Sequence, residues 1–379
     1  MNANTVLGIL GSGQLSRMTA QAAHELGIKT HVLCTEPEQQ TSPASQVATK
    51  TTKSGFDNKE KILKFISECD FVTLENEFIN QEILNAIEDL FPNKLYPSVQ
   101  TFKLIGDKIT EKNTFEQAGI KVCPYQEVTT KADVTNFIKQ HGVPVVLKSA
   151  KGGYDGYGNI TIKSEDQIES ALEKLKGQKL VEAFIPYTKE LAIMAARNTT
   201  ETVYYPIAET IQENHICHYV SIPADIPKHV EDQIKQASEK ALNAIKARGL
   251  FAFEFFLTQD HQVYLNESAP RPHNSGHYTM NACVTSQFHN HVRSVLDLPL
   301  GSTELITKYA MMLNLLGTTN QIAELQPLNE FLKVKNSHLH LYGKHQSKPG
   351  RKMGHYTICG NNTDEIFQTL KHLKGIYSL

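Results

Sequence analysis

One stretch of the chain, residues 249–279, leaves few choices of local fold. Residues 252–257 are aromatic and apolar except for Glu254, and residues 263–267 form a second short apolar run that ends in Glu267. The polar segment between the two runs is rich in turn-forming residues. This pattern predicts two antiparallel strands that are joined by a hairpin.

The register of this hairpin decides where the two acids lie. A symmetric loop centred on Asp260 and His261 pairs residues whose numbers sum to a constant, so it places Glu254 directly opposite Glu267. Like charges that face each other across two strands repel, and an acid among phenylalanines is costly without a partner. An asymmetric loop would keep the acids apart. A symmetric loop, which we expect, predicts a divalent cation between them with the oxygen ligands that Mg²⁺ prefers.

The segment that follows the second acid reads as a loop at a strand end. Residues 268–277 contain Pro270 and Pro272, and two prolines forbid a continuing central strand. Loops at the ends of strands commonly carry functional groups. Between the prolines, Arg271 offers a planar fork that suits phosphate or bicarbonate. We therefore expect this loop to bind an anion beside the acids.

The composition of the chain excludes several classes of function. Its 379 residues suffice for two or three domains, and its net charge of −2 argues against a dedicated nucleic-acid binder. The six cysteines are scattered without zinc-like spacing, which predicts a reducing cytoplasm. The first residues lack a basic segment followed by a long apolar one, so we expect no signal peptide, and no apolar run in the sequence approaches the length of a membrane span. We expect a cytoplasmic protein with small-molecule partners, and with neither nucleic acid nor membrane as a partner.

The N-terminal segment has the pattern of a Rossmann-like α/β unit. A predicted strand over residues 5–10 is followed by the loop GSGQLS, a helix, and a second strand over residues 29–34. The loop offers backbone N–H groups to a phosphate, and Glu36 lies where a ribose-binding acid would sit, so a nicotinamide dehydrogenase is an alternative. Residues 75–77 add two acids at a later strand end, which suit either ligand contacts or a solvated loop.

Three further features suggest contacts with anions. Lys148 ends an apolar strand, where a buried lysine needs an anionic partner. The glycine-rich loop over residues 152–158 is either a phosphate-wrapping lid or a flexible hairpin tip. Lys344 and Arg351 flank a basic hairpin and could approach one phosphate from opposite sides.

Apolar periodicity predicts the remaining elements. A long amphipathic helix over residues 230–248 should end at Gly249 as its cap, and two histidines in a helix over residues 286–296 have no acid or cysteine at ligand spacing, so we expect them to be structural. The other elements that we expect are strands over residues 71–74, 179–185 and 309–316 and helices over residues 131–141 and 364–373.

Four motifs in order, GILGSGQL, GGYDGYG, NESAPRPHNSGHYT and GRKMGH, resemble those of the ATP-grasp ligases. Within that superfamily the chain is similar to the 5-(carboxyamino)imidazole ribonucleotide synthetases over essentially its whole length. The resemblance implies an α/β fold (α+β ATP-grasp). It implies a Rossmann-like domain over residues 1–100, an ATP-grasp domain over residues 101–300 with a mobile lid at about 122–187, and a small β-rich C-terminal domain over residues 301–379.

The resemblance also implies a reaction. ATP, bicarbonate and 5-aminoimidazole ribonucleotide would give the carboxyamino product through carboxyphosphate in purine biosynthesis, with ATP and Mg²⁺ as cofactors and a homodimer as the assembly. Either carboxyphosphate or carbon dioxide released from it would carboxylate the amine. An alternative within the superfamily is a ligase like formate-dependent glycinamide ribonucleotide transformylase, which usually has an acid where this chain has Asn274. The dehydrogenase alternative leaves the two opposed acids and GGYDG unexplained.

Roles for individual residues follow from the same resemblance. The metal would lie on Glu254 and Glu267, and Arg271, His273, Asn274 and Asp155 would be catalytic. The residues expected to bind ATP are Lys108, Lys148, Gly153, Tyr154, Asp155, Gly156, Tyr157, Gly158, Asn159, Glu182, Ala183, Phe184, Ile185, Glu190, Asn266 and Glu267. The residues expected to bind the ribonucleotide are Gly13, Gln14, Leu15, Tyr154, Asp155, Lys344 and Arg351.

This chain departs from the superfamily at two places. Thr210 and Gln212 stand where the family often has an asparagine and a histidine, so the sequence leaves open whether Gln212 contacts ATP. Ala269 stands where many ATP-grasp enzymes place an asparagine as a third metal ligand, and either Asn266 or water would fill that place.

Overall fold

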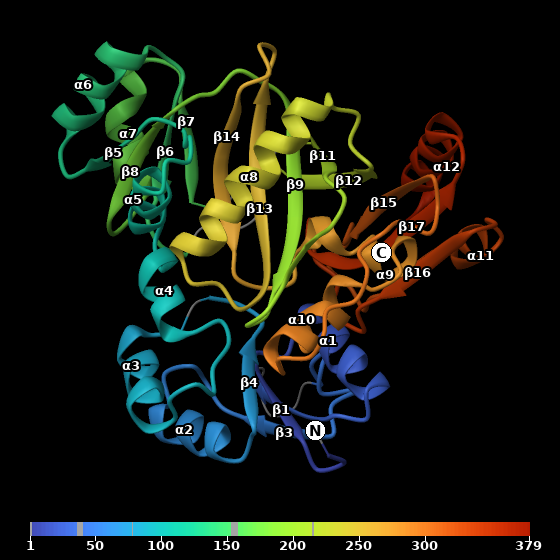
Figure 1. Ribbon diagram of the computed structural model, residues 1–379. Coiled ribbons are helices and arrows are strands. Elements are labelled where there is room, and N and C mark those ends of the chain that lie inside the picture. The colour runs from blue at the N-terminus through green and yellow to red at the C-terminus, as the bar shows by residue number, and fades with distance from the viewer. Residues whose placement is uncertain (1, 36–40, 78, 153–157, 214–215) are drawn as a thin grey trace.

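The computed structural model describes residues 2–35, 41–77, 79–152, 158–213 and 216–379. Figure 1 shows the N-terminal segment in blue at the bottom, a green segment at the upper left, and the red C-terminal segment at the right. These three surround the yellow and green strands of a long central sheet. The hairpin that carries the two acids belongs to this central sheet.

The N-terminal segment forms a parallel sheet in the order β3-β2-β1-β4. β1, β2 and β4 are mainly buried because helices cover the faces of a parallel sheet, whereas the edge strand β3 is polar and partly exposed. The predicted strands over residues 29–34 and 71–74 are confirmed at those bounds. The elements of this segment are β1 (Val6–Leu10), α1 (Gln14–Glu25), β2 (Lys29–Cys34), β3 (Lys50–Lys53), α2 (Lys59–Ser67), β4 (Phe71–Leu74), α3 (Gln81–Leu90) and α4 (Val99–Ile105).

A small antiparallel sheet in the order β5-β8-β6-β7 forms the green segment at the upper left of Figure 1. Its apolar side chains pack against helices α6 and α7. The predicted helix over residues 131–141 is confirmed at those bounds. The elements are α5 (Lys108–Gln117), β5 (Tyr125–Val128), α6 (Lys131–His141), β6 (Val145–Ser149), β7 (Asn159–Ile162), η1 (Glu165–Gln167), α7 (Ile168–Lys174) and β8 (Lys179–Ala183).

The central sheet runs in the order β14-β13-β9-β11-β12-β15-β17-β16, and β10 pairs with β9. Its strands are β9 (Tyr187–Arg197), β10 (Thr202–Tyr204), β11 (Ala208–Glu213), β12 (Ile216–Ile222), β13 (Gly249–Thr258), β14 (Val263–Ala269), β15 (Tyr309–Leu316), β16 (Ser337–Leu341) and β17 (Lys352–Gly360). The remaining helices are α8 (Lys228–Ala244), η2 (Asn274–Gly276), α9 (Thr279–Ala282), α10 (Gln287–Val295), α11 (Leu328–Leu332) and α12 (Thr363–Ile376).

Strands from beyond residue 300 therefore continue the sheet that holds the acids, because β15 pairs with β12. The sheet crosses the domain boundary that we expected at residue 300. That boundary and the one at residue 100 stay predictions.

The pleat of β13 separates its aromatic residues from its acid. Phe251, Phe253 and Phe255 pack with α8 in one apolar cluster, whereas Leu250 and Ala252 belong to another cluster on the opposite face. Successive side chains of a strand point to opposite faces, so Glu254 lies on the face away from these phenylalanines. The acid is thereby removed from the apolar core that its neighbours in the sequence build.

The end of the long helix differs from the prediction. α8 ends at Ala244, and Lys246 adopts the left-handed conformation with φ of 51°. Gly249, with φ of 122°, is instead the first residue of β13. Gly249 as the helix cap is thus wrong, because Lys246 breaks the helix earlier.

The histidines of α10 have structural partners, as expected. His291 is fully buried and accepts a hydrogen bond from the backbone N–H of Leu250 at 3.1 Å. Its other ring nitrogen lies 2.8 Å from Oγ1 of Thr73 on β4. His289 contacts Glu25 at 2.8 Å. These contacts join the N-terminal sheet to the central sheet.

Along the described parts of the chain, every helix falls short of the length and apolarity that crossing a membrane demands.

Candidate active site

The hairpin places Glu254 opposite Glu267 as predicted, but by a different route. Near the turn Leu257 pairs with Val263, so the loop is centred on Asp260 alone, and His261 takes a positive φ of 60°. This is the geometry of a three-residue hairpin loop. The predicted symmetric loop centred on two residues is therefore wrong.

A β-bulge restores the pairing of the acids. The register shifts by one residue between Glu254 and Phe255, and Asn266 is the extra residue of β14. On a regular strand Glu267 would share a face with Leu265, which packs in the aromatic cluster beside α8. The bulge turns Glu267 to the face of Glu254 instead. Asn266 and Glu267 consequently both line the cavity on that face.

A cavity of about 1080 Å³ lies where the small sheet, the central sheet and the N-terminal segment meet. It is lined by residues from four distant parts of the chain. The predicted site residues among its lining are Lys108, Lys148, Asn159, Glu182, Ala183, Phe184, Ile185, Glu190, Glu254, Asn266, Glu267, Arg271, His273 and Asn274. Gly153, Tyr154, Asp155, Gly156, Tyr157 and Glu36 lie outside the described residues. Gly158 precedes β7 with φ of 83°.

The two opposed acids titrate in opposite directions. Burial, and then the charge of Glu267, raise the pKa of Glu254. The ammonium of Lys108, which lies 2.7 Å from Oε2 of Glu267, holds the pKa of Glu267 below its usual range. The ion pair with Lys108 therefore keeps Glu267 ionised. Glu254 favours its protonated form in the absence of a bound cation.

The acid pair fits a magnesium ion that is shared with phosphates. Glu254 and Glu267 keep 25% and 40% of their side-chain exposure, so both carboxyls are open to the cavity. Within the described ranges no cluster of three or more His, Cys, Asp or Glu could hold a metal. Mg²⁺ is commonly bound by one or two carboxylates together with substrate phosphates, which matches this set. The oxygen of Asn266 lies in the same cavity wall.

A buried charge network supports the basic side of the cavity. The carboxyl of Glu182 lies between Lys148, at 2.8 Å, and Lys112, at 3.2 Å. Burial would raise the pKa of Glu182, but these two lysines outweigh burial and lower it. Nζ of Lys148 also lies 3.4 Å from Oδ1 of Asn266. The side chain of Glu182 thus orients two lysines, a role that its sequence context does not reveal.

Sequence reasoning assigned no role to Lys112, which is nearly fully buried. The available signal was its spacing of four residues from Lys108 on one helix face. A neighbouring residue was missed too: Glu111 accepts hydrogen bonds from the backbone N–H of Ser268 at 2.8 Å and from its hydroxyl at 2.6 Å. Helix α5 therefore fixes the strand segment directly after Glu267.

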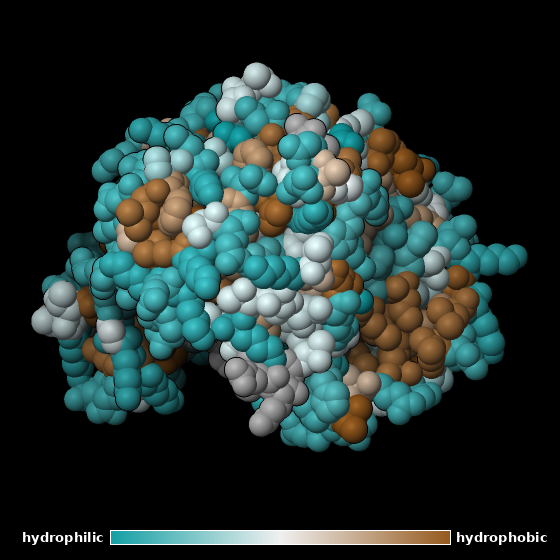
Figure 2. All heavy atoms as spheres, turned by 90° about the horizontal axis from the view of Figure 1, so that it is seen from below, coloured by the Kyte–Doolittle hydropathy of each residue, from teal (hydrophilic) through white to brown (hydrophobic). Residues whose placement is uncertain are grey.

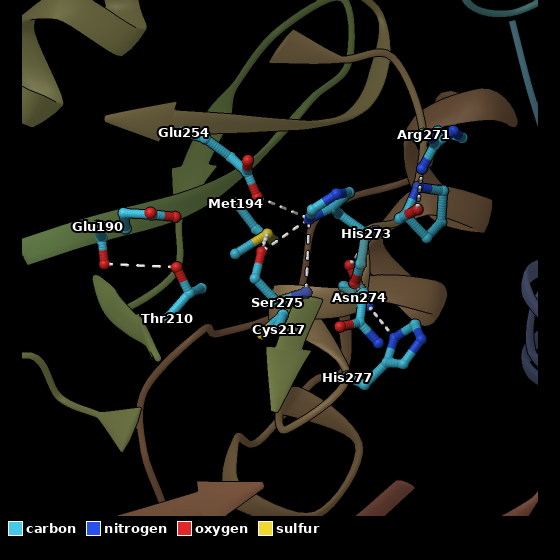
Figure 3. Close-up of polar contacts among 12 residues, drawn as sticks. Glu190, Met194, Thr210, Cys217, Glu254, Arg271, His273, Asn274, Ser275 and His277 are labelled. Atoms are coloured by element: carbon cyan, nitrogen blue, oxygen red, sulfur yellow. Dashed lines mark hydrogen bonds and ion pairs between the residues drawn. The ribbon is translucent and has the colours of Figure 1, made fainter. Parts of the chain in front are cut away.

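The loop after β14 carries Arg271 and His273 to the cavity. Arg271 forms a fork with Glu77, with Nε 2.8 Å from Oε2 and Nη2 3.2 Å from Oε1. Nδ1 of His273 lies 3.6 Å from Glu254 and 2.8 Å from Oγ of Ser275 (Figure 3). Glu77 is one of the two acids at positions 75 and 77, so one of them does face the site.

Aromatic rings form another wall of the cavity. Tyr187 stacks on Phe256 with ring centroids 4.5 Å apart and planes 10° apart, and Phe184 stands partly exposed beside them. Such rings suit a planar base. Thr210 and Gln212 line the cavity as well, although the sequence left the contact of Gln212 open.

Of the residues expected to bind the ribonucleotide, Tyr154 and Asp155 lie outside the described residues, and Gly13, Gln14, Leu15, Lys344 and Arg351 lie outside the lining of this cavity. At the start of α1, the carboxyl of Glu75 accepts hydrogen bonds from the N–H groups of Gly13 at 2.5 Å and Leu15 at 3.2 Å. Burial raises the pKa of Glu75, and the charge of Lys344 acts against that rise. A carboxylate held on these donors gives no support to the dehydrogenase alternative, which needs them for a pyrophosphate.

The other members of that expected set are only partly together. The start of α1, with Gln14 as its first residue, and Lys344 both act on Glu75. Nζ of Lys344 donates to the carbonyl of Lys352 at 2.7 Å, and Nη1 of Arg351 donates to the carbonyl of Gln346 at 2.8 Å. The structure therefore brings Lys344 near the start of α1 and leaves Arg351 bonded within its own loop.

Three protein-family models match successive parts of the chain. Residues 4–106 match the ribonucleotide synthetase preATP-grasp domain. Residues 113–288 match the ATP-grasp domain. Residues 310–369 match the phosphoribosylaminoimidazole carboxylase C-terminal domain.

Known proteins are similar over nearly the full chain. The N5-carboxyaminoimidazole ribonucleotide synthase of Bacillus subtilis is 38% identical, over 96% of this chain and 94% of that protein. The phosphoribosylaminoimidazole carboxylase of Candida glabrata is 40% identical over 99% of this chain, which spans 67% of that protein. The Aspergillus clavatus synthase solved with ADP and 5-aminoimidazole ribonucleotide has a TM-score of 0.90 at 32% identity and covers 99% of both chains.

The raised pKa of Glu254 predicts how the ligand-free protein responds to pH. Its folded pKa lies above the unfolded value, so between these values the folded state holds a proton that the unfolded state has lost. The free energy of unfolding should therefore fall as pH rises from about 5 to about 8. Urea unfolding in EDTA measures it, with Glu254→Gln as the control that cannot titrate. An equal pH response of both proteins would contradict this.

Proposed function

Since the chain belongs to the N5-carboxyaminoimidazole ribonucleotide synthases of the ATP-grasp superfamily, we propose that it carboxylates 5-aminoimidazole ribonucleotide with bicarbonate and ATP. The observation that carries this proposal is the pair Glu254 and Glu267, which lines one cavity together with Lys108 and Lys148. Opposed acids beside two lysines are the arrangement that a metal–triphosphate needs.

The ATP site follows from the cavity walls. The stacked pair of Tyr187 and Phe256 would take the adenine, and the backbone of residues 182–185 would meet its edge. Glu190 would accept the ribose hydroxyls. Glu254 and Glu267 would hold Mg²⁺, which supplies charge neutralisation on the phosphates when bound. Lys108 and Lys148 would add positive charge beside the transferred phosphoryl group, with Asn266 and Asn159 at its borders.

Two bond exchanges make up the proposed reaction. An oxygen of bicarbonate attacks the γ-phosphorus, the bond to the ADP oxygen breaks, and carboxyphosphate forms. The exocyclic amine then bonds to the carboxyl carbon, phosphate leaves, and the amine loses a proton. Arg271, His273 and Asn274 would hold the anion. His273 or Asp155 would take the proton, and His273 is already set 3.6 Å from Glu254.

The ribonucleotide would lie between the N-terminal segment and the loop that carries Lys344. The start of α1, from Gly13 to Leu15, would face the imidazole, and Lys344 with Arg351 would take the phosphate after rearrangement of Arg351. Tyr154 and Asp155 of the lid would close over it. Asn274, an amide rather than an acid, argues for bicarbonate over formate.

The domain ranges 1–100, 101–300 and 301–379, with the lid at about 122–187, are proposed as the units of this enzyme. The described cysteines are all free, in keeping with the predicted cytoplasmic location.

We also propose a homodimer. Figure 2 shows an apolar area at the side where α11 and β16 lie in Figure 1. Exposed apolar residues of that region are Ile322, Leu328, Leu332 and Leu341.

Omitting each substrate in turn tests the proposed reaction. ADP release should require both bicarbonate and 5-aminoimidazole ribonucleotide, because the phosphoryl group needs an acceptor and the amine consumes the product. A coupled spectrophotometric assay measures the release. Turnover that ignores the ribonucleotide, or that needs formate in place of bicarbonate, would refute the assignment.

Glu267→Gln tests the metal site. We expect turnover to fall by about 100-fold or more while the fold is kept, because the amide cannot balance the cation. Steady-state ADP release measures turnover, and circular dichroism measures the fold. Glu209→Gln is the matched control, since it breaks an ion pair with Lys189 on the same sheet outside the cavity. A rate like the wild type in Glu267→Gln would remove the metal hypothesis.

The mass of the protein in solution, measured by light scattering after size-exclusion chromatography, tests the homodimer. The wild type should have twice the mass of one chain, and Leu332→Asp should lower that mass toward one chain, because a buried carboxylate opposes an apolar contact. Leu332 is 63% exposed in one chain. Leu90→Asp, on the N-terminal segment and 60% exposed, is the control and should stay dimeric. A monomeric wild type would show the prediction to be wrong.

A further inference from the structure

Strand β15 contains one polar residue in an otherwise apolar run. Its sequence, YAMMLNLL, has Asn314 at the sixth position, and this side chain is fully buried. A buried carboxamide without hydrogen-bond partners destabilises a fold by about 1–3 kcal/mol. Asn314 does not line the cavity, so it is not explained by contact with a substrate.

The partners of Asn314 lie in the loop of the candidate active site. Its Nδ2 donates to Oδ1 of Asn274 at 2.8 Å, and Nδ2 of Asn274 donates back to its Oδ1 at 2.8 Å. Nδ2 of Asn314 also donates to the carbonyl of Cys217 at 3.0 Å. The bond to this carbonyl fixes the orientation of the Asn314 amide, and the reciprocal pair then fixes that of Asn274.

A row of polar side chains extends this support across the sheet. Asn314 lies opposite His355, and His355 lies opposite His340, so the three share one face. The rings of His355 and His340 stack at 4.5 Å, and His277 from the loop lies 5.0 Å from His355. The loop that follows β14 therefore rests on strands from beyond residue 300.

The position of Asn274 governs its neighbours in the loop. His273 precedes it, and Ser275 follows it with Oγ 2.8 Å from Nδ1 of His273 and its backbone N–H 3.4 Å from that atom. Ser275 is itself buried against Met194 (Figure 3). A shift of Asn274 would therefore move the ring of His273 relative to Glu254.

We propose that Asn314 is a positioning residue for the carboxylation step. It holds the carboxamide of Asn274 and thereby sets His273 at the place where the carboxyphosphate would form. The inference rests on the proposed function and deepens it, because it assigns a strand of the C-terminal segment to the reaction. Displacements of about 1 Å in such groups can lower rates by roughly 100-fold.

Two variants of Asn314 test this role. Asn314→Leu removes both hydrogen-bonding groups at similar volume, and Asn314→Asp keeps the shape but loses the donor to Asn274. We expect kcat for the carboxylated product to fall by roughly 10- to 100-fold, with KM for ATP within about twofold of the wild type. The ratio of ADP to carboxylated product should rise above one, because a misplaced carboxyphosphate hydrolyses before the amine reacts.

Thr357→Val is the matched control. Thr357 is fully buried on the neighbouring strand β17, and its hydroxyl has no hydrogen-bond partner among the residues that the structure describes. Its replacement should leave kcat, both KM values and the product ratio unchanged. Thermal unfolding of all three variants separates stability from catalysis.

Asn314→Leu with the kinetics and product ratio of Thr357→Val would overturn the proposal, whatever its melting temperature. If Asn314→Leu does not fold, the same comparison is made with Asn314→Asp, and failure of both to fold would assign Asn314 to folding alone and also reject the proposal. These outcomes leave the proposed function standing, since that function fails only if the wild type shows no turnover with the ribonucleotide and bicarbonate.

Discussion

The repulsion between two carboxyls that face each other on one hairpin is the constraint to which the rest of the site responds. Glu254 and Glu267 share a cavity wall, and within the described parts of the chain only Glu267 has a lysine at ion-pair distance. The balance is completed by Lys148 and Lys112, which are themselves held by the buried Glu182. Glu267, Lys112 and Arg271 thus each have a counterpart of opposite charge from a distant part of the chain.

Local pattern was sufficient for much of the fold. The strands over residues 29–34 and 71–74 and the helix over residues 131–141 appear at the predicted bounds because apolar periodicity and glycine caps act within a few residues. The end of α8 was missed because Lys246, without the signal of a glycine, takes the left-handed conformation. The pairing of the acids was predicted from a symmetric loop, whereas a three-residue loop and a bulge produce it.

The residues of the candidate site that belong to a sequence motif were predictable. The residues that reach the site only through a tertiary contact were not. Glu267 and Arg271 stand in one motif, Glu254 lies in the same stretch of residues 249–279, and the cavity brings the three together. Glu77 and Asn314 lie almost 200 and 40 residues from the loop that they contact. No periodicity or spacing predicts such contacts, because they arise from the continuation of the central sheet through β15 and from the docking of the N-terminal segment.

The bulge at Asn266 has a consequence for how this hairpin is compared with others. Before it, paired residues of β13 and β14 have numbers of the same parity, and after it their parity differs. A face assigned by counting odd and even positions is therefore correct for Leu265 and inverted for Glu267 and Ala269. The chemistry of the site depends on the number of residues in β14 as much as on their identity. A sequence alignment that removes or shifts the extra residue Asn266 would place the carboxyl of Glu267 on the wrong face of the sheet.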